Sequence, residues 1–595
     1  MKPQNRWANA LGGLDRLKQI ENVYTRSAIE IGGLSGTVEE WQTAQGQYKQ
    51  SVDLGGVYRF LTVFDGEKGW ILDQNGKVRE LAGTDLENEV TSTYLGSFSH
   101  LIPGRMSGRA ENLGEDEAQQ HDIVKLLPQG GRPVTCYLDK ATYLPVKQEQ
   151  PEADRTRTVH LSDWRDVDGV KIPFQMRQTT GDPKYDTVVT VQEVRFNVPL
   201  DETAFQKPQE AAPDFRFAAG QSAPGIPLEL NNNHIYLQVQ INNSEPLGFI
   251  LDTGAAASVI DTRRAEALDL ELQGELEGRG AGEGSTNVAI AKGVSFQLPG
   301  VELFDQTIAV ISLESFESHE GRTIDGILGY DFISRFVVEI DYAAELIHLY
   351  DPQGYEYAGS GESLPITLEG NVPLLYAKVV QSERDPIDGK FLIDTGAGGT
   401  LGLNKPFIET HELLKSSQKT IQALFGMGVG GETKHHVGRL NNLQLGQFVI
   451  EDPVIGFSQD AKGALANPDL AGLLGGEILR RFRVIFDYAR QQMILEPNAT
   501  FAEPYEYDMS GTYLIAEGPA FKAFKVYRTL ENAPASEAGL QQGDVITAID
   551  DRPATEFTLN QVRQLLKQEE GREYLLSIER DEEPLQIQIR LRRLI

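Results

Sequence analysis

The sequence is poor in cysteine and in basic residues, and it lacks long apolar runs. Cys136 is the single cysteine among 595 residues, so no disulfide bond can form within the chain. No run approaches the roughly 20 apolar residues of a membrane-spanning helix, so we expect no transmembrane segment. The 55 Lys and Arg residues face 87 Asp and Glu residues, which gives a net charge of −32. Because nucleic acid and anionic membranes repel so acidic a chain, we expect neither as the main partner.

Tryptophan is missing from the sequence after residue 164. The four tryptophans are Trp7, Trp41, Trp70 and Trp164, which indicates that the N-terminal part is a separate unit. Its start, LGGLDRLKQIENV, has helical periodicity, and YRFLTVF, KGWILD and VTCYLD alternate like strands. We therefore predict an α+β, half-barrel-like domain over residues 1–207, in which one helix packs on a mostly antiparallel β-sheet.

Three further segments follow the early helix in a characteristic order: FDGEKGW, VTCYLDKATYLPVK and WRDVDGVKIPFQM. Over about residues 8–207 this order resembles the lipoprotein-carrier family of the bacterial envelope. The resemblance implies a periplasmic, cell-envelope or secreted protein. The first residues, MKPQNRWANALGGLDRL, hold no apolar signal core. We therefore expect either that a signal peptide has been removed or that the protein is cytoplasmic.

A linker and an internal repeat come next. Residues 208–225, PQEAAPDFRFAAGQSAPG, are rich in Pro, Ala and Gly, which is typical of a linker. Beyond it one β-rich pattern occurs twice, with the small drift in spacing that loop insertions produce. The spacing is 138 residues between Pro227 and Pro365, 142 between Asp252 and Asp394, and 146 between residues 329–342 and 475–488. We therefore predict two copies of one β unit, at residues 226–352 and 362–498.

Each copy contains an apolar strand that ends in an aspartate and a small, flexible turn. The first reads FILDTGAAAS and the second FLIDTGAGGT. A buried carboxylate costs free energy unless neighbouring groups hydrogen-bond it. We expect the threonine of each turn to offer its hydroxyl and the glycine to let the backbone approach closely. The predicted supporting residues are Thr253, Gly254, Thr395 and Gly396.

A pseudo-twofold axis between the copies would bring Asp252 and Asp394 face to face. Two carboxyl groups in contact cannot both ionise easily, so they share one proton. One can then accept a proton from water while the other donates one to a carbonyl oxygen. That is general acid–base attack on an amide, without a covalent intermediate.

A second motif, two hydrophobic residues and a glycine, occurs once in each copy, as Ile327-Leu328-Gly329 and Leu473-Leu474-Gly475. Together with the two Asp-Thr-Gly turns it resembles the aspartic proteases, and the short lobes are closest to retropepsin-like members. The resemblance covers roughly residues 226–498. It implies two β-barrel lobes fused in one chain, as in pepsins, and a monomer that hydrolyses polypeptide. It also implies that Asp252 and Asp394 form the catalytic pair and that no metal or organic cofactor is required.

The family closes a glycine-rich hairpin, the flap, over its substrate, and two segments are candidates. One lies 28 residues after Asp252 and the other, GMGVGG, lies 32 residues after Asp394. The candidate flap residues are Gly280, Ala281, Gly282, Gly426, Met427 and Gly428. GMGVGG also fits a dinucleotide-binding pattern, but the strand-like ETKHHVGRLNNLQLG follows it where that site needs a helix.

Alanine follows each Asp-Thr-Gly, at Ala255 and Ala397, where many pepsins have Ser or Thr. Without that hydroxyl the charged pair loses a hydrogen bond, so its pKa values should be higher. We therefore predict activity nearer neutral pH than that of pepsin.

The C-terminal segment ENAPASEAGLQQGDVITAIDDRPA resembles a bacterial PDZ domain, which we predict over residues 505–595. A PDZ domain adds an extended peptide to its sheet edge and holds the peptide's C-terminal carboxylate in backbone N–H groups. We expect peptide tails as partners here, for substrate recruitment or regulation. The predicted carboxylate loop is Gly511, Thr512, Tyr513 and Leu514.

Other residues have simpler interpretations. Cys136 is expected in a core, and His435 and His436 are expected on the surface of a strand rather than as ligands. Two functional hypotheses remain. The first is an aspartic endopeptidase of the cell envelope, and the second is a catalytically silent scaffold that binds peptides or lipoproteins through the N-terminal sheet and the PDZ groove.

Overall fold

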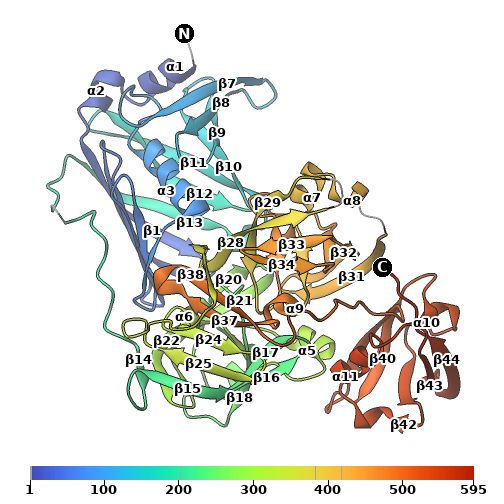
Figure 1. Cartoon of the computed structure of the whole chain (residues 1–595). Helices are drawn as coiled ribbons and strands as arrows, with labels where there is room; N and C mark the ends of the chain where they lie inside the picture. Colours follow the sequence, from blue (N-terminus) through green and yellow to red (C-terminus); the bar gives the residue numbers. More distant parts are fainter. Residues whose placement is uncertain (1–2, 202, 382–383, 417–418) are drawn as a thin grey trace.

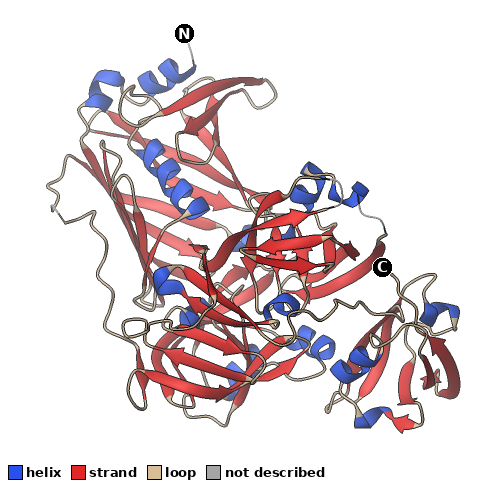
Figure 2. Ribbon diagram, viewed as in Figure 1, coloured by secondary structure: helices blue, strands red, loops and turns tan. Residues whose placement is uncertain are grey.

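The computed structural model describes residues 3–201, 203–381, 384–416 and 419–595. Strands dominate it and form separate sheets in the N-terminal part, in each repeat copy, between the copies and at the C-terminus (Figures 1 and 2). The chain is therefore mainly β and multidomain, as the sequence predicted. Among the helices of the described residues, none is long and apolar enough to cross a membrane.

The N-terminal part forms one antiparallel sheet with the order β6-β5-β4-β3-β2-β1-β13-β12-β11-β10-β9-β8-β7. The chain winds outward from β1, passes through α3 (Gly83–Gly96) and winds back until β13 pairs with β1. In Figure 1, α3 lies along the sheet. The strands are β1 (Asn22–Ile31), β2 (Leu34–Thr43), β3 (Tyr48–Leu54), β4 (Tyr58–Phe64), β5 (Gly69–Leu72), β6 (Val78–Glu80), β7 (Gly108–Asp116), β8 (His121–Pro128), β9 (Val134–Asp139), β10 (Pro145–Glu152), β11 (Arg155–Val167), β12 (Val170–Thr179) and β13 (Thr187–Phe196).

The predicted single helix at the start of the chain is two short helices, α1 (Pro3–Ala10) and α2 (Leu14–Lys18). The break between them has a steric cause. Gly12 and Gly13 have φ angles of +129° and +88°, and a Cβ at Gly12 would lie 2.1 Å from the carbonyl oxygen of Gly169. Apolar side chains of these helices, of α3 and of the sheet form one core, which contains Cys136 as predicted.

The segment predicted as a linker, residues 208–225, is only partly irregular. It contains β14 (Phe215–Phe217), which pairs with β22 of the first lobe, and most of β15 (Ser222–Pro227), which pairs with β25. The rings of Phe215 and Phe217 lie 5.0 and 5.7 Å from that of Phe336, centroid to centroid. The two phenylalanines therefore anchor the segment to the first lobe, because burying their rings outweighs the turn-forming composition around them.

The two repeat copies form two lobes with matching orders of elements. The first lobe contains β16 (Glu229–Asn231), β17 (His234–Ile241), β18 (Leu247–Leu251), β19 (Val259–Asp261), α4 (Thr262–Ala267), β20 (Leu272–Gly278), β21 (Thr286–Leu298), β22 (Val301–Ile311), α5 (Glu314–Glu320), β23 (Gly326–Leu328) and α6 (Tyr330–Ile333). The second contains β27 (Thr367–Glu369), β28 (Val372–Val380), β29 (Ile387–Ile393), β30 (Leu401–Leu403), α7 (Lys405–Thr410), α8 (Leu413–Ser416), β31 (Ile421–Gly428), β32 (Gly431–Arg439), β33 (Asn442–Leu445), β34 (Phe448–Glu451), β35 (Val454–Ser458), β36 (Gly472–Leu474) and α9 (Gly476–Leu479).

A shared sheet joins the lobes, with the order β15-β25-β24-β37-β38-β26. At its centre β24 (Val337–Asp341) pairs antiparallel with β37 (Phe482–Asp487), and Glu339 lies opposite Ile485. These two residues are 146 positions apart, which is the spacing of the repeat at this point. Equivalent residues thus face each other, as a pseudo-twofold axis requires. The other strands are β25 (Leu346–Tyr350), β26 (Glu362–Pro365) and β38 (Gln492–Pro497).

The C-terminal part is a separate sheet with the order β39-β40-β41-β43-β44. Its elements are β39 (Thr512–Glu517), β40 (Ala523–Thr529), α10 (Pro534–Glu537), β41 (Val545–Ile549), β42 (Arg552–Pro553), α11 (Leu559–Leu565), β43 (Glu573–Arg580) and β44 (Glu583–Arg590). It contacts the first lobe beyond the end of α5. A Cβ at Gly321 would lie 2.8 Å from Cβ of Leu559 on α11 and 3.6 Å from that of Ala516 on β39.

The expectation that His435 lies on the surface is wrong. It lies on β32 and is fully buried, and this burial lowers the pKa of its imidazole to about 3. Successive side chains of a strand point to opposite faces, and His435 shares the buried face of β32 with Thr433 and Val437.

The shared sheet predicts which side chains contribute most to the stability of the lobes. Phe486 on β37 is fully buried, whereas Tyr376 on β28 is 71% exposed. We expect Phe486→Ala to lower the free energy of opening of β24 and β37 by about 3 to 5 kcal/mol. Tyr376→Ala should cost less than about 0.5 kcal/mol. Native-state hydrogen exchange of peptides over the two strands measures both values, and equal losses would contradict the assignment of the shared core.

Candidate active site

Asp252 and Asp394 each come directly after a β-strand of their own lobe. Asp252 follows β18 and its N–H donates to the carbonyl oxygen of Leu328 at 3.0 Å, while the N–H of Asp394, after β29, donates to that of Leu474 at 2.9 Å. The partner strands β23 and β36 run parallel to β18 and β29. The second sequence motif therefore lies beside the aspartate in both lobes.

The glycines of that second motif have a steric role. A Cβ at Gly329 would lie 2.5 Å from the carbonyl oxygen of Ala257, and a Cβ at Gly475 would lie 2.4 Å from that of Gly399. Both distances are too short for any side chain. The backbone of the turn after each aspartate thus contacts the glycine directly, with no room for a Cβ atom between them. This contact explains why the two motifs occur together.

The structure brings the two carboxyl groups together across the lobe interface. They lie within hydrogen-bonding reach of each other, and each residue is half-buried, so solvent still reaches it. A Cβ at Gly254 would lie 2.7 Å from Cγ of Asp394, and a Cβ at Gly396 would lie 2.2 Å from Cγ of Asp252. The N–H groups of Gly254 and Gly396 donate to Oδ1 of the aspartate in their own turn, at 2.8 and 2.9 Å.

Thr253 and Thr395 act differently from the sequence expectation. Their hydroxyls do not donate to the carboxylates but cross to the opposite lobe, where they donate to the carbonyl oxygens of Ile393 and Leu251 at 2.7 and 2.8 Å. Each hydroxyl also accepts the backbone N–H of the other threonine, at 3.0 Å in both directions. Both threonines are at most 2% exposed. This reciprocal pair fixes the two turns relative to each other.

The pKa values of both aspartates are raised above their ordinary value. Burial is the largest cause for both carboxyls. The neighbouring Asp252 raises the pKa of Asp394 further, to well above its ordinary value, while hydrogen bonding to Asp394 lowers that of Asp252. Two carboxyl groups in contact titrate as one unit, and these raised pKa values favour a pair that shares one proton.

His234 is a functional candidate that the sequence analysis missed. It begins β17 and its Nδ1 lies 2.9 Å from Oε2 of Glu320 at the end of α5. Burial lowers the pKa of His234, but Glu320 and the aspartate pair outweigh this and raise it, so the imidazolium form is favoured. In turn its charge lowers the pKa values of both aspartates. A comparison of the two repeat copies could have revealed it. The equivalent position in the second copy, 138 residues later, is Val372, so the histidine is not part of the repeated pattern.

The two predicted flap segments meet each other. Gly280, Ala281 and Gly282 lie in the loop between β20 and β21, and Gly426, Met427 and Gly428 end β31 before its tight connection to β32. The N–H of Gly282 donates to the carbonyl oxygen of Val429 at 3.0 Å, and that of Gly284 to Gly430 at 2.9 Å. A Cβ at Gly282 would lie 2.3 Å from the carbonyl carbon of Gly430, so only glycine permits this approach.

The predicted carboxylate loop of the C-terminal part is already filled by a side chain. Gly511 lies before β39, whereas Thr512, Tyr513 and Leu514, which were predicted to precede the first strand, belong to β39. Oδ1 of Asp508 accepts the N–H groups of Ser510, Gly511 and Thr512 at 3.0, 2.6 and 3.3 Å. A peptide carboxylate can use these donors only if Asp508 moves away.

Within the described ranges, no group of three or more His, Cys, Asp and Glu side chains is arranged to hold a metal ion.

Comparisons with known proteins find two described domain families in the chain. A family model described as aspartyl protease matches residues 237–332, which include Asp252 and run from β17 to α6. A model described as PDZ domain matches residues 525–580. The chain contains an aspartyl protease domain and a PDZ domain. A further model, described only as an uncharacterized protein, matches residues 112–209.

Solved structures similar to this chain resemble it over about a third of its length. A DUF1329 family protein from Desulfovibrio piger is 15% identical, with 34% of this chain and 95% of that chain covered and a TM-score of 0.26. A putative outer membrane lipoprotein-sorting protein domain from Vibrio parahaemolyticus is 14% identical, with 32% and 94% covered and a TM-score of 0.24. A LolA superfamily protein from Nitrosomonas europaea is 10% identical, with 34% and 95% covered and a TM-score of 0.26. No curated protein matches the chain.

The raised pKa of Asp394 predicts a pH-dependent cost in stability. Above the ordinary aspartate pKa of about 3.9, the unfolded chain releases a proton that the folded protein retains, so stability falls as the pH rises. Asp394→Asn cannot titrate and escapes this cost. We therefore expect the melting temperature of the variant, relative to the native protein, to increase between about pH 4 and pH 7.5. Differential scanning fluorimetry measures it, and a difference that stays constant with pH would contradict the raised pKa.

Proposed function

We propose that the protein is an aspartic endopeptidase that cuts extended polypeptide with a water molecule activated between Asp252 and Asp394. The observation that carries this proposal is the contact of the two carboxyl groups across the pseudo-twofold axis, each at the start of an Asp-Thr-Gly turn. The aspartyl protease match over residues 237–332 supports the same class of reaction.

A pair that shares one proton can act as base and acid at once. The charged carboxyl accepts a proton from the attacking water, and the protonated carboxyl donates its proton to the carbonyl oxygen of the scissile amide. This gives a neutral tetrahedral diol without a covalent bond to the enzyme. Aspartic proteases in general use two carboxyl groups that share one proton, which is the same chemistry. The threonine pair holds the two turns in place while the proton moves between them.

The flap segments supply the means to enclose a substrate. In the structure their tips are joined by backbone hydrogen bonds from Gly282 and Gly284 to the second hairpin. A polypeptide that enters between the tips and the aspartates would exchange these bonds for bonds to its own backbone, and closure would then exclude water from the reaction. Substrate recognition through main-chain groups fits the small residues at Gly280, Ala281 and Gly282.

The proposal also covers where the protein acts and what its PDZ domain does. We place the protein in the cell envelope because of the features that its N-terminal part shares with lipoprotein carriers. We also propose that the PDZ domain recruits polypeptide tails or regulates the protease. β39 is an edge strand next to α11, and the first lobe contacts both at Gly321, so a tail that binds there would displace this contact.

Cleavage of a denatured protein mixture tests the activity directly. We expect the native protein to produce fragments, and both pepstatin and Asp252→Asn to reduce the rate by a factor of about 1,000 or more, because the variant cannot hold the charge that activates water. Circular dichroism provides the control that the variant is folded. Cleavage that persists in Asp252→Asn would rule the proposal out and favour the non-catalytic scaffold.

The pH profile is a separate prediction. Ala255 and Ala397 offer no hydroxyl to the charged pair, and both aspartates have raised pKa values. Because the pair is active while it holds one proton, a raised upper pKa extends activity toward neutral pH. We expect the optimum of kcat/KM to lie above about pH 4.7, the upper pKa of the pepsin pair. An optimum well below about pH 4 would contradict the assignment.

A further inference from the structure

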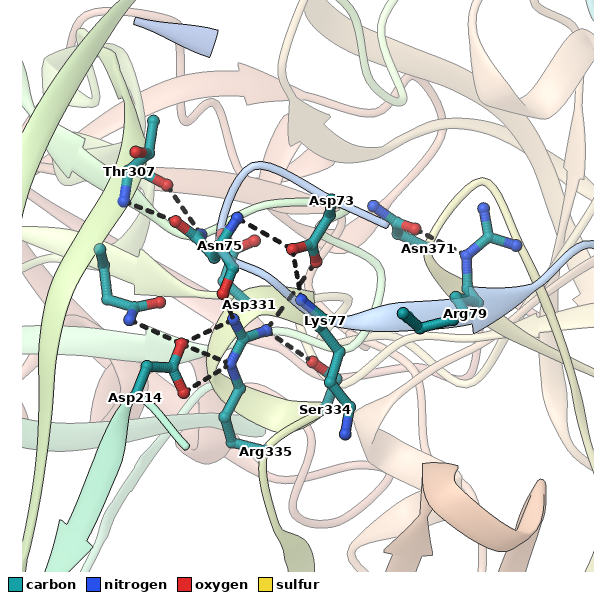
Figure 3. Close-up of polar contacts among 12 residues, drawn as sticks. Asp73, Asn75, Lys77, Arg79, Asp214, Thr307, Asp331, Ser334, Arg335 and Asn371 are labelled. Carbon is teal, nitrogen blue, oxygen red and sulfur yellow. Dashed lines mark hydrogen bonds and ion pairs between the residues drawn. The ribbon is translucent and has the colours of Figure 1, made fainter. Parts of the chain in front are cut away.

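The β5–β6 hairpin of the N-terminal domain reaches the protease lobes at two places. Its turn, residues 73–77, lies on the first lobe, and Arg79 on β6 lies against the second (Figure 3). Both contacts are close to the turn that follows Asp252. The N-terminal domain is therefore in contact with elements that position a proposed catalytic residue.

Asn75 anchors the hairpin to the first lobe. Its amide pairs with the backbone of Thr307 on β22, accepting the N–H at 2.8 Å and donating to the carbonyl oxygen at 3.1 Å. The backbone carbonyl oxygen of Asn75 accepts a hydrogen bond from Nη2 of Arg335 at 3.1 Å. Beside it Asp331, whose pKa burial raises to about 7, accepts the N–H of Ser258 at 2.6 Å. Figure 3 shows these side chains converging on one buried cluster.

Arg79 anchors the hairpin to the second lobe. Its side chain is 7% exposed and donates in three directions. Nε donates to Oδ1 of Asn371 at 2.9 Å, Nη1 donates to the carbonyl oxygen of Leu368 at 3.0 Å, and Nη2 lies 2.8 Å from Oδ2 of Asp85. Because Asp85 belongs to the N-terminal domain, Asn371 and Leu368 are the contacts that Arg79 makes with the protease lobes.

The bond from Arg79 fixes which way the amide of Asn371 points. An arginine only donates, so it must meet the amide oxygen, and Nδ2 is then turned to the other side. There Nδ2 donates to the carbonyl oxygen of Ala256 at 3.3 Å. Ala256 lies in the turn that begins with Asp252. A continuous path thus runs from Arg79 through Asn371 to the backbone of the first catalytic turn.

In the second half of the pseudo-twofold arrangement, Glu477 of the protease lobes contacts the asparagine that is equivalent to Asn371. Asn233, which is 138 residues before Asn371, donates through Nδ2 to the carbonyl oxygen of Gly398 in the second turn, at 2.7 Å. Its amide also donates to Oε2 of Glu477 at 2.8 Å, so the protease lobes themselves hold it. The equivalent of Glu477, 146 residues earlier, is Asp331. Asp331 is one methylene shorter and binds Ser258 instead.

We propose that Arg79 is a positioning residue for the active site, which acts through Asn371 on the turn that begins with Asp252. On this view the N-terminal domain is a working part of the catalytic unit and not a removable prosegment. The proposal rests on the proposed protease function for its catalytic consequence. The physical claim, that Arg79 orders this turn, does not depend on catalysis.

Three variants separate positioning from simple stabilisation. Arg79→Ala removes the donor, and Asn371→Gly removes the intermediate residue at a position where the φ angle of +68° suits glycine. The double variant combines them. The matched control is Arg59→Ala, which removes an arginine of the same domain whose side chain is 66% exposed in a surface ion pair with Asp53.

We expect Arg79→Ala and Asn371→Gly each to lower kcat about tenfold while KM changes less than about twofold, because the turn and not the substrate contacts is disturbed. The double variant should be no slower than the slower single variant, since both lie on one path. Arg59→Ala should match the native protein. A folded Arg79→Ala variant with native kcat, or losses that multiply in the double variant, would overturn the proposal.

A readout independent of activity distinguishes the two proposals. Hydrogen exchange followed by mass spectrometry should show faster exchange over residues 252–258 in Arg79→Ala, with the melting temperature of the lobes within a few degrees of native. Arg59→Ala should exchange at the native rate. If the native protein does not cleave polypeptide, the protease proposal fails while this measurement still decides the role of Arg79. Unchanged exchange over residues 252–258 would overturn it.

Discussion

Two carboxyl groups in contact within a half-buried site cannot both carry a charge, and the rest of the protease unit is arranged to keep Asp252 and Asp394 in that position. Burying carboxyl groups costs free energy, so the surrounding structure must compensate for it. The support is rigid backbone. The reciprocal bonds of Thr253 and Thr395 lock the two turns together, and Gly329 and Gly475 let each turn rest on its own lobe. The shared β24–β37 pair then fixes the lobes relative to each other.

The flanking domains break this symmetry in different ways. The N-terminal domain contacts the β27–β28 connection, where Arg79 holds Asn371. On the other side Glu320, near the PDZ domain, holds His234 at the start of β17, where the second lobe has Val372. The two aspartates therefore sit in unequal environments although their own turns are almost identical. An unequal pair is what general acid–base chemistry needs, since one carboxyl must be charged while the other keeps its proton.

Local patterns and the repeat predicted the mainly β, multidomain fold, because strand alternation and motif spacing are properties of short segments. They could not predict contacts between segments. The threonine hydroxyls were expected on the carboxylates but cross to the opposite lobe, which depends on how closely the lobes approach. His435 was expected on the surface, but it lies on the buried face of β32 with Thr433 and Val437. The segment 208–225 has the composition of a linker, yet two phenylalanines attach it to the first lobe.

By itself the sequence determined that one β unit occurs twice, that each copy carries an Asp-Thr-Gly segment, and that a glycine follows two hydrophobic residues later in each copy. These features belong to short segments, so they can be recognised directly in the order of residues. Tertiary structure alone decided that the carboxyls meet, that the two glycine-rich segments join, and that Arg79 reaches the turn that begins with Asp252 through Asn371. The physical reason is that these contacts join residues more than 100 positions apart, so they exist only once whole domains have packed together.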